Sequence, residues 1–238
     1  MDEIKKAAGH ITGIYTEPIS LSEPFIDFSA RFASMPGTTV LMSGGDLDCA
    51  RHHILGAKPW LVFSGLGRNM TITVENQTFD FMADPFDTLR MILKAFCVND
   101  LDLDQSDLPK PVYAGLFGYL AYDLKDCLEK LPRTSIDRLC LPHIYFMAPS
   151  IIVVHDKIND TTRLWIPERK FAGKNNLEKD LAVFKRSISD KPPKNGSFSG
   201  DAGGFKSNFA QAGYMNAIKK IREYIAAGDV YQVNMSQR

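Results

Sequence analysis

The sequence predicts an α+β fold in which most of the sheet is antiparallel. Two pairs of strand-like segments are each joined by a short polar turn, which is typical of β-hairpins, and helical segments are scattered between them. Strict alternation of single strands and helices, which would favour a doubly wound parallel sheet, is not seen. The chain has 238 residues, of which 45% are hydrophobic and 24% charged, as in an average globular protein with one large or two small domains.

The first half of the chain predicts a helix, four strands and a second helix. The first helix begins near Ser22, because Pro24 suits the first helical position and the phenylalanines after it are spaced for one helical face. Asp84 followed by Pro85 is typical of a second helix start, with apolar residues at helical spacing as far as residue 96. Strands are predicted at residues 38–42, 60–63, 70–74 and 78–82, the last two as a hairpin.

The second half predicts a further strand, a short helix, a second hairpin and another helix. Residues 112–119 form a glycine-bearing strand that leads into a short helix ending before Pro132. The hairpin pairs residues 145–154 with residues 162–166 across the turn at residues 157–160. Apolar residues at helical spacing from residue 177 to residue 188 predict the helix, with Asn175 or Asn176 as its cap.

The last fifty residues predict a change of domain. Residues 189–204 are almost entirely Ser, Asp, Lys, Pro, Asn and Gly, and so cannot bury enough apolar surface to offset the entropy of ordering them. A helix follows and ends at Gly228, which suits a left-handed C-terminal cap. Residues 230–238 then alternate between apolar and polar, as in a half-buried strand.

We therefore expect a domain at residues 1–188, a flexible linker at residues 189–206, and the helix and first strand of a second domain at residues 207–238. The final strand has no later partner, so we expect that the rest of the second domain is missing. The alternative is that this strand pairs with earlier ones as the edge of a complete sheet.

Charge and cysteine content exclude several classes of protein. Lys and Arg number 28, as do Asp and Glu, so we expect no nucleic-acid or anionic-membrane partner. The longest apolar stretch, residues 144–154, is far shorter than the ~20 residues that a membrane helix requires. The four cysteines include no C-x-x-C pair, and the N-terminus has no apolar signal region. We expect a cytoplasmic protein with reduced cysteines rather than a secreted domain with two disulfides.

No catalytic motif is complete on its residues alone. Gly65 and Gly67 are followed by strand residues, so a turn is favoured over a phosphate-binding loop. His52 and His53 are adjacent and point in different directions on any regular element, so no metal site is predicted there. This lack of a catalytic constellation agrees with the expected missing segment.

Two segments resemble the component I enzymes that act on chorismate. Residues 227–238, AGDVYQVNMSQR, closely resemble the GD-[IV]-[YF]-Q-V-N-L-[ST]-Q-R segment of aminodeoxychorismate synthase component I; anthranilate synthase component I usually has Val at the position of Asn234. Residues 115–124, GLFGYLAYDL, are similar to the G-x-x-G-Y-x-x-Y-D segment of both enzymes. Residues 41–44 fall where the family has an early motif at the end of a strand.

This resemblance implies an α/β sandwich of two intertwined halves, of which this chain is similar to the N-terminal half. It implies that the whole enzyme replaces the C4 hydroxyl of chorismate by ammonia, giving 4-amino-4-deoxychorismate for p-aminobenzoate and folate synthesis. It also implies Mg²⁺ as cofactor and a glutamine amidotransferase subunit as partner. The magnesium ligands and the catalytic lysine belong to the C-terminal half, so we expect this chain alone to be inactive. The alternatives are anthranilate synthase component I and a stand-alone module that binds an amino acid or docks a subunit.

The resemblance singles out Gln232 and Ser43 as site residues. Related enzymes that add water have a lysine base at the position of Gln232, whereas a glutamine amide accepts no proton near neutral pH and ammonia needs no such base. Gln232 therefore fits an ammonia-using enzyme; the alternative is a polar residue on the solvent face of a strand. Ser43 falls in the family's tryptophan pocket, but Met42 replaces the acidic residue usual in feedback-inhibited enzymes. The alternative for Ser43 is a simple turn with the two glycines that follow it.

Overall fold

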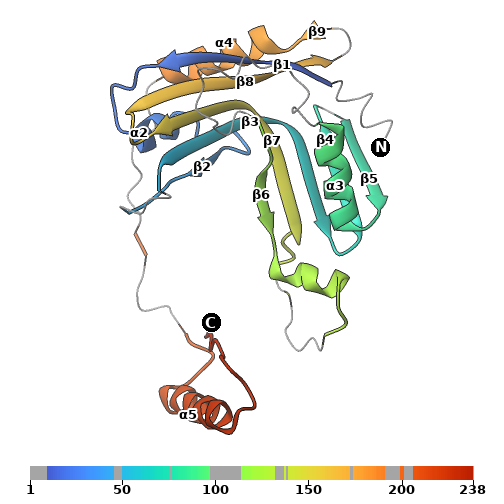
Figure 1. Cartoon of the computed structure of the whole chain (residues 1–238), viewed down its shortest axis with the longest axis vertical. Helices are drawn as coiled ribbons and strands as arrows, with labels where there is room; N and C mark the ends of the chain where they lie inside the picture. The colour runs from blue at the N-terminus through green and yellow to red at the C-terminus, as the bar shows by residue number, and fades with distance from the viewer. Residues whose placement is uncertain are drawn as a thin grey trace. The chain divides into compact units, whose positions relative to one another are not determined.

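The computed structural model describes residues 10–45, 50–75, 77–96, 114–131, 137, 139–171, 174–190, 199–200 and 206–237. The chain divides into two compact units, Met1–Pro193 and Lys194–Arg238. In its described residues the first unit is a single antiparallel sheet of nine strands with a few helices against it (Figure 1). This confirms the predicted α+β class.

The elements of the first unit follow the predicted order, except that the strands at residues 10–19 and 174–175 were not predicted. The helices are α2 (Phe25–Ala30), α3 (Pro85–Ala95), α4 (Leu177–Ser189) and the 3-10 helix η1 (Tyr122–Cys127). The strands are β1 (His10–Ile19), β2 (Thr39–Leu41), β3 (His52–Leu66), β4 (Asn69–Val74), β5 (Gln77–Met82), β6 (Phe117–Leu120), β7 (Ile144–Asp156), β8 (Thr161–Phe171) and β9 (Lys174–Asn175).

The two long strands β3 and β7 form the centre of the sheet. They pair from His52 opposite Asp156 to Gly65 opposite Ile144, with one register shift between Pro59 and Leu61. Pro59 lies opposite Pro149 but Leu61 lies opposite Ala148, so β3 carries one extra residue there, as in a β-bulge.

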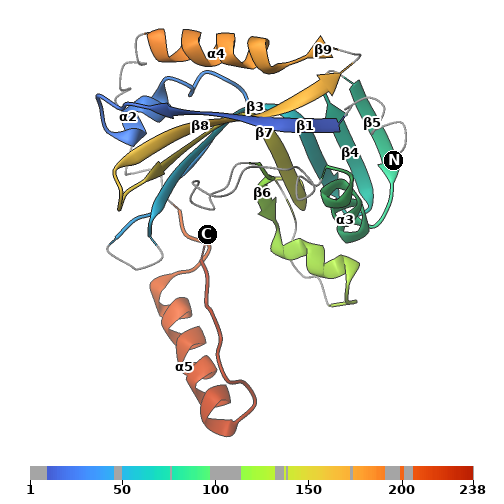
Figure 2. The ribbon, with the colours of Figure 1, turned by 45° about the horizontal axis from the view of Figure 1, so that its top comes forward.

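The neighbours of the central pair change at this bulge. Before the bulge β3 pairs with β2, and the corresponding half of β7 pairs with β8, which in turn pairs with β1. Beyond the bulge β3 pairs with β4, β4 pairs with β5, and the other half of β7 pairs with β6. Figure 2 shows α4 running beside β8 and α3 beside β4 and β5. Each half of the central pair therefore has its own sheet neighbours and its own helices.

Separate apolar clusters pack on the two halves. One contains Trp60, Phe63 and Ile72 of the sheet with Ile92 of α3. Another contains Phe28 of α2 and Phe184 of α4, together with apolar residues of β3, β7 and β8. A third joins side chains of β6, β7 and β8. The first two clusters share no residue, whereas the third contains residues from both halves, such as Met147 and Ile152 of β7.

Several local predictions are confirmed. The β4–β5 and β7–β8 hairpins form where expected. Asp84 caps α3: its Oδ1 accepts the backbone N–H of Phe86 at 3.0 Å and that of Asp87 at 3.1 Å. Pro24, predicted as the first residue of a helix, is instead the residue that precedes α2.

The predicted strand at residues 60–63 is only part of β3, which begins at His52. Gly56 and Pro59 are poor strand formers, so the local pattern hides the first half of this strand. The cross-strand pairing with β7 holds it in place. The prediction was wrong here because strand propensity is weaker than tertiary pairing.

The second unit contains the helix α5 (Gln211–Ala227). It ends at Gly228 as predicted, with φ of 82°, a left-handed conformation that favours glycine. Residues 230–237 form no strand, which corrects the prediction from their alternating pattern. A strand requires a hydrogen-bonded neighbour, and no described residue pairs with this segment. Most of the predicted linker at residues 189–206 lies outside the described residues.

Two smaller expectations can be compared with the described part of the chain. Of the helices in that part, none has both the length and the apolar content needed to cross a membrane. Cys127 and Cys140 carry free thiols, whereas Cys49 and Cys97 lie outside the described residues.

Candidate functional site

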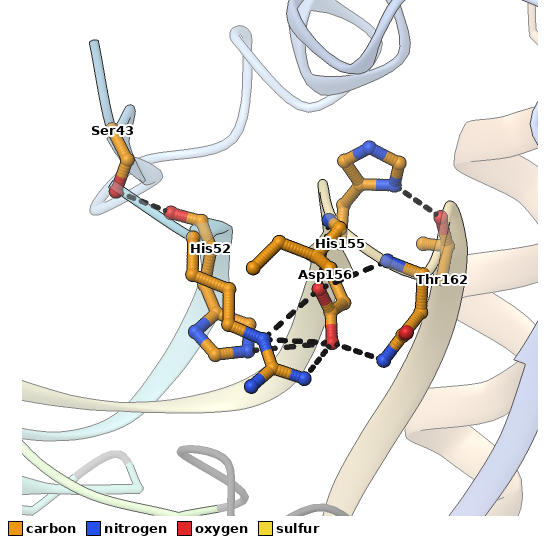
Figure 3. A network of polar contacts seen from close by, with 8 residues as sticks. Ser43, His52, His155, Asp156 and Thr162 are labelled. Atoms are coloured by element: carbon orange, nitrogen blue, oxygen red, sulfur yellow. Dashed lines mark hydrogen bonds and ion pairs between the residues drawn. The ribbon is translucent and has the colours of Figure 1, made fainter. Parts of the chain in front are cut away.

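Ser43 lies just beyond the end of β2, against the start of β3. Its hydroxyl donates to the backbone carbonyl of His52 at 2.7 Å, and its backbone N–H donates to Nδ1 of His53 at 3.1 Å. The ammonium group of Lys157, in the β7–β8 turn, donates to the carbonyl of Ser43 at 3.3 Å. We call this group, together with Arg51, the Ser43 corner; Figure 3 shows Ser43 and His52 of this corner, with His155, Asp156 and Thr162 beside them.

His53 is a neutral imidazole in this corner. Burial lowers the pKa of His53, and its electrostatic interactions with Lys157 and His155 lower the pKa further. Because Nδ1 accepts the Ser43 N–H, the neutral ring carries its proton on Nε2. The ring lies 5.6 Å from that of Phe25 and 5.9 Å from that of His155, at interplanar angles of 35° and 21°. His53 and His155, which pack on the buried ring of Phe25, therefore form a partly exposed aromatic surface beside Ser43.

Asp156 fixes the turn that carries Lys157. Its buried carboxylate accepts from Nη2 of Arg51 at 2.6 Å, from Nδ2 of Asn159 at 3.0 Å and from the backbone N–H of Ile158 at 3.0 Å. The hydrogen bonds from Arg51 hold the pKa of this carboxyl well below its usual range and outweigh the opposing effect of burial. Figure 3 shows His155 and Asp156, neighbours on β7, pointing to different sides, with His155 directed at Thr162.

The geometry of the Ser43 corner suits binding and not nucleophilic catalysis. A serine nucleophile requires a base that accepts its hydroxyl proton, but the Ser43 hydroxyl donates to a main-chain carbonyl. The corner contains an aromatic surface, the hydroxyl oxygen of Ser43, which can still accept a hydrogen bond, and the ammonium group of Lys157. These are the groups that recognise a small aromatic molecule with polar substituents.

Gln232, the other predicted site residue, lies in the second unit. Its side chain is exposed, and its Nε2 lies 3.4 Å from Oδ1 of Asn234. The two amides predicted to share one side of this segment are therefore within hydrogen-bonding distance of each other.

The described residues do not fit a magnesium site. Nowhere in the described ranges do three His, Cys, Asp or Glu side chains gather closely enough to hold a metal ion. Since Mg²⁺ is held by carboxylates, we assign no ligand to it and route no chemical step through it.

The glycine-tyrosine segment at residues 115–124 has a structural explanation in β6. A Cβ atom on Gly118 would lie 1.9 Å from the carbonyl oxygen of Tyr145, so only glycine allows β6 to approach β7 this closely. Tyr119, the next residue, stacks on Tyr145 with 6.0 Å between ring centroids. This part of the segment therefore sets strand packing.

Sequence reasoning missed Arg51, His155, Asp156 and Lys157. The predicted turn at residues 157–160 was a partial signal, because it placed His155 and Asp156 at the end of a hairpin. The pairing of that end with His52 and His53 is set by β3 and β7, and no local pattern reports it.

Comparison with known proteins identifies the family. A model of the family described as chorismate binding enzyme matches residues 54–238, and the chain belongs to this family. Anthranilate synthase component 1 of Cereibacter sphaeroides is 31% identical over 211 residues, covering 83% of this chain and 41% of that protein. Aminodeoxychorismate synthase component 1 of Bacillus subtilis is 31% identical over 132 residues, covering 52% and 27%. The protein of that name from Escherichia coli is 23% identical over 224 residues, covering 89% and 44%.

A solved structure supports the fold. Anthranilate synthase component I from Streptococcus pneumoniae superposes with a TM-score of 0.56 at 19% sequence identity, covering 87% of this chain and 44% of that one. The chain thus spans less than half the length of each of these relatives.

Proposed function

We propose that the chain is the N-terminal part of an aminodeoxychorismate synthase component I. The whole enzyme would exchange the C4 hydroxyl of chorismate for an amino group and release water, giving 4-amino-4-deoxychorismate for p-aminobenzoate and folate synthesis. Family membership supports an enzyme that uses chorismate. The relatives carry both component I names, so the choice of product rests on particular residues.

The choice of aminodeoxychorismate over anthranilate as the product rests on Asn234. Anthranilate synthases usually have Val at the position that it occupies, and its side chain lies 3.4 Å from Gln232. Gln232 supports the use of ammonia, because its amide can accept a hydrogen bond from ammonia without acting as a base. Anthranilate synthase component I is the second candidate, because a relative of that name is 31% identical across 83% of this chain.

The proposed reaction needs a source of ammonia. The relatives are named as first components, which supports a second subunit, and we propose that this subunit is a glutamine amidotransferase. Mg²⁺ belongs to the proposal as the cofactor of the whole enzyme, with ligands outside the described residues.

The proposal is tested by supplying chorismate, ammonium and Mg²⁺ to the protein that is encoded by the gene containing these residues. The compound that this protein forms is then identified. We expect 4-amino-4-deoxychorismate, followed by absorbance and separated by chromatography. Accumulation of fluorescent anthranilate would refute the assignment, and so would the absence of any aminated product. The 238-residue chain assayed by itself should give no turnover.

A variant pair tests the role of Gln232. Gln232→Lys should lower the amination rate at least tenfold, because an ammonium side chain has no acceptor for ammonia. Gln237→Lys introduces the same charge on the other side of the alternating segment and should leave the rate within twofold. Equal amination rates for the two variants would show that Gln232 is not part of the proposed site.

We also propose that the Ser43 corner binds tryptophan. The aromatic surface of His53 and His155, which pack on Phe25, supports an indole ligand, and the Ser43 hydroxyl can still accept a hydrogen bond. Tryptophan should raise the thermal unfolding midpoint of the chain by mass action. Ser43→Ala should abolish this rise, whereas Ser22→Ala, at an exposed site, should retain it. A rise that survives in Ser43→Ala would place tryptophan elsewhere.

A further inference from the structure

The end of β2 is attached to β3 through the ring of His53. β2 pairs with β3 over Thr39–Leu41, and beyond this pairing the backbone N–H of Ser43 donates to Nδ1 of His53 at 3.1 Å. The next two residues, Gly44 and Gly45, are exposed, and a Cβ added at either position would meet no atom within 4 Å. Among the described residues, the contacts of Ser43 therefore hold this end of β2 on the sheet.

The hydrogen bond from Ser43 to His53 requires a neutral imidazole. A neutral ring has one nitrogen that accepts and one that donates, whereas both nitrogens of a protonated ring donate. Protonation of His53 therefore removes the acceptor of the Ser43 N–H and places a positive charge beside that donor. The Ser43 hydroxyl keeps the carbonyl of His52, and the Ser43 carbonyl keeps the ammonium group of Lys157, but neither contact satisfies the N–H.

The surroundings of His53 favour its neutral ring at pH 7. His155 lies opposite on β7, with 5.9 Å between the ring centroids, and Lys157 lies in the turn that follows. Burial is the main cause of the lowered pKa of His53, and Lys157 and His155 lower this pKa further. The helix α2 contributes the uncharged ring of Phe25, 5.6 Å from that of His53.

The buried carboxylate of Asp156 does not offset these effects. It lies 2.6 Å from Nη2 of Arg51 and 3.9 Å from Nε2 of His52, the neighbours of His53 on β3. Figure 3 shows Asp156 pointing to a different side from His155, whose ring stacks on that of His53. The negative charge of Asp156 is therefore directed away from the ring that holds Ser43.

We propose that His53 is a pH-sensitive latch, which holds the end of β2 on β3 when neutral and releases Ser43 and the two glycines after it when protonated. Because the pKa of His53 lies below its ordinary value of 6.5, the latch is closed at neutral pH and opens in acid. A ligand that requires the closed Ser43 corner would be released in acid. The latch itself involves neither a ligand nor amination, so the inference does not depend on the proposed function.

The backbone N–H of Ser43 reports the state of the latch in the full 238-residue chain. Protein labelled with ¹⁵N-serine and with ¹³C in the histidine rings is titrated by NMR from about pH 8 to about pH 5. The two signals are assigned by their absence from Ser43→Ala and His53→Asn. We expect the Ser43 N–H and the His53 ring to change together, with one midpoint below pH 6.5.

Two variants separate the latch from other titrations. The side-chain oxygen of His53→Asn can accept the Ser43 N–H but does not titrate, so the Ser43 signal should stay constant. Below the wild-type midpoint, the Ser43 N–H should exchange with solvent roughly tenfold faster in the wild type than in His53→Asn. The matched control His155→Asn keeps the latch, and its midpoint should move up toward 6.5, because one of the groups that lower the pKa of His53 is removed.

The wild-type titration alone can refute the latch, whether or not the variants fold. The proposal is overturned if the wild-type Ser43 signal stays constant while the His53 ring titrates. It is also overturned if the Ser43 signal titrates equally in His53→Asn and in the wild type, or if Ser43 exchanges at the same rate in both below the midpoint.

Discussion

Replacing Asp180 by Asn tests the buried charge network that joins α4 to the sheet. The Asp180 side chain on α4 is fully buried and accepts from Nη2 of Arg169 on β8 at 2.8 Å. It also accepts from the ammonium group of Lys58, the residue with φ of 52° beside the bulge in β3. Arg169 is itself only 2% exposed. Asp180→Asn removes the negative charge that both cations share.

The expected loss in the free energy of unfolding depends on the hydrogen-bond partners that Arg169 retains. Breaking a buried ion pair by removing one partner costs about 3–5 kcal/mol, because the remaining charge is buried without compensation. Arg169 retains the carbonyl of Pro167 at 3.0 Å and the carboxylate of Glu75 at 3.5 Å. Lys58 can turn to solvent, because 36% of its side chain is exposed. We therefore expect the lower end of the range, about 3 kcal/mol.

Urea unfolding followed by tryptophan fluorescence measures this loss, because the ring of Trp60 lies beneath Arg169. For a slope near 2 kcal/mol per molar urea, the midpoint should fall by about 1.5 M. Glu178→Gln, on the exposed side of the same helix, is the matched control and should change the free energy of unfolding by less than about 0.5 kcal/mol. A loss below about 1 kcal/mol for Asp180→Asn would refute the view that this network holds α4 in place.

Two further substitutions test local features of the first unit. Asp156 has a folded-state pKa below its ordinary value of 3.8, so the stability that it contributes is present above about pH 4 and is lost as the pH falls toward that lowered pKa. Asp156→Asn should therefore lower the free energy of unfolding by about 2 kcal/mol at pH 7 and flatten its decline in acid, measured by urea unfolding across pH. An unchanged acid slope would contradict this. Gly118→Ala should lower the thermal midpoint markedly, because the new Cβ would meet the carbonyl of Tyr145 at 1.9 Å, whereas Gly115→Ala meets no atom within 4 Å and should be tolerated. Equal midpoints for the two alanine variants would show that β6 can move away from β7 at little cost.

The sequence predicts those parts of the fold that depend on neighbouring residues. Asp84 caps the start of α3 and Gly228 caps the end of α5, each through contacts within a few residues. The β4–β5 hairpin is closed by a short turn. The bulge beside Pro59 depends on which residues of β7 lie opposite, and no pattern within β3 reports that. Residues 230–237 show the opposite case, in which a clear alternating pattern has no strand partner in the described part of the chain.

The residues of the candidate site could likewise be predicted from the sequence only in part. Ser43 was found because a family resemblance singled it out. The groups around it were missed, because Arg51 and Asp156 are 105 residues apart along the chain. Their contact requires the register of β3 against β7, in which His52 lies opposite Asp156.

The one-to-one pairing of β3 with β7 on either side of the bulge restricts how the length of this chain can vary. Deleting one residue between Leu61 and Leu66 would slide the residues after it by one position against β7. Since successive side chains of a strand face opposite sides, those residues would then exchange the two faces of the sheet. Homologues should therefore keep the spacing between His52 and Leu66 constant, and their insertions and deletions should collect in connections such as the exposed turn at residues 157–160.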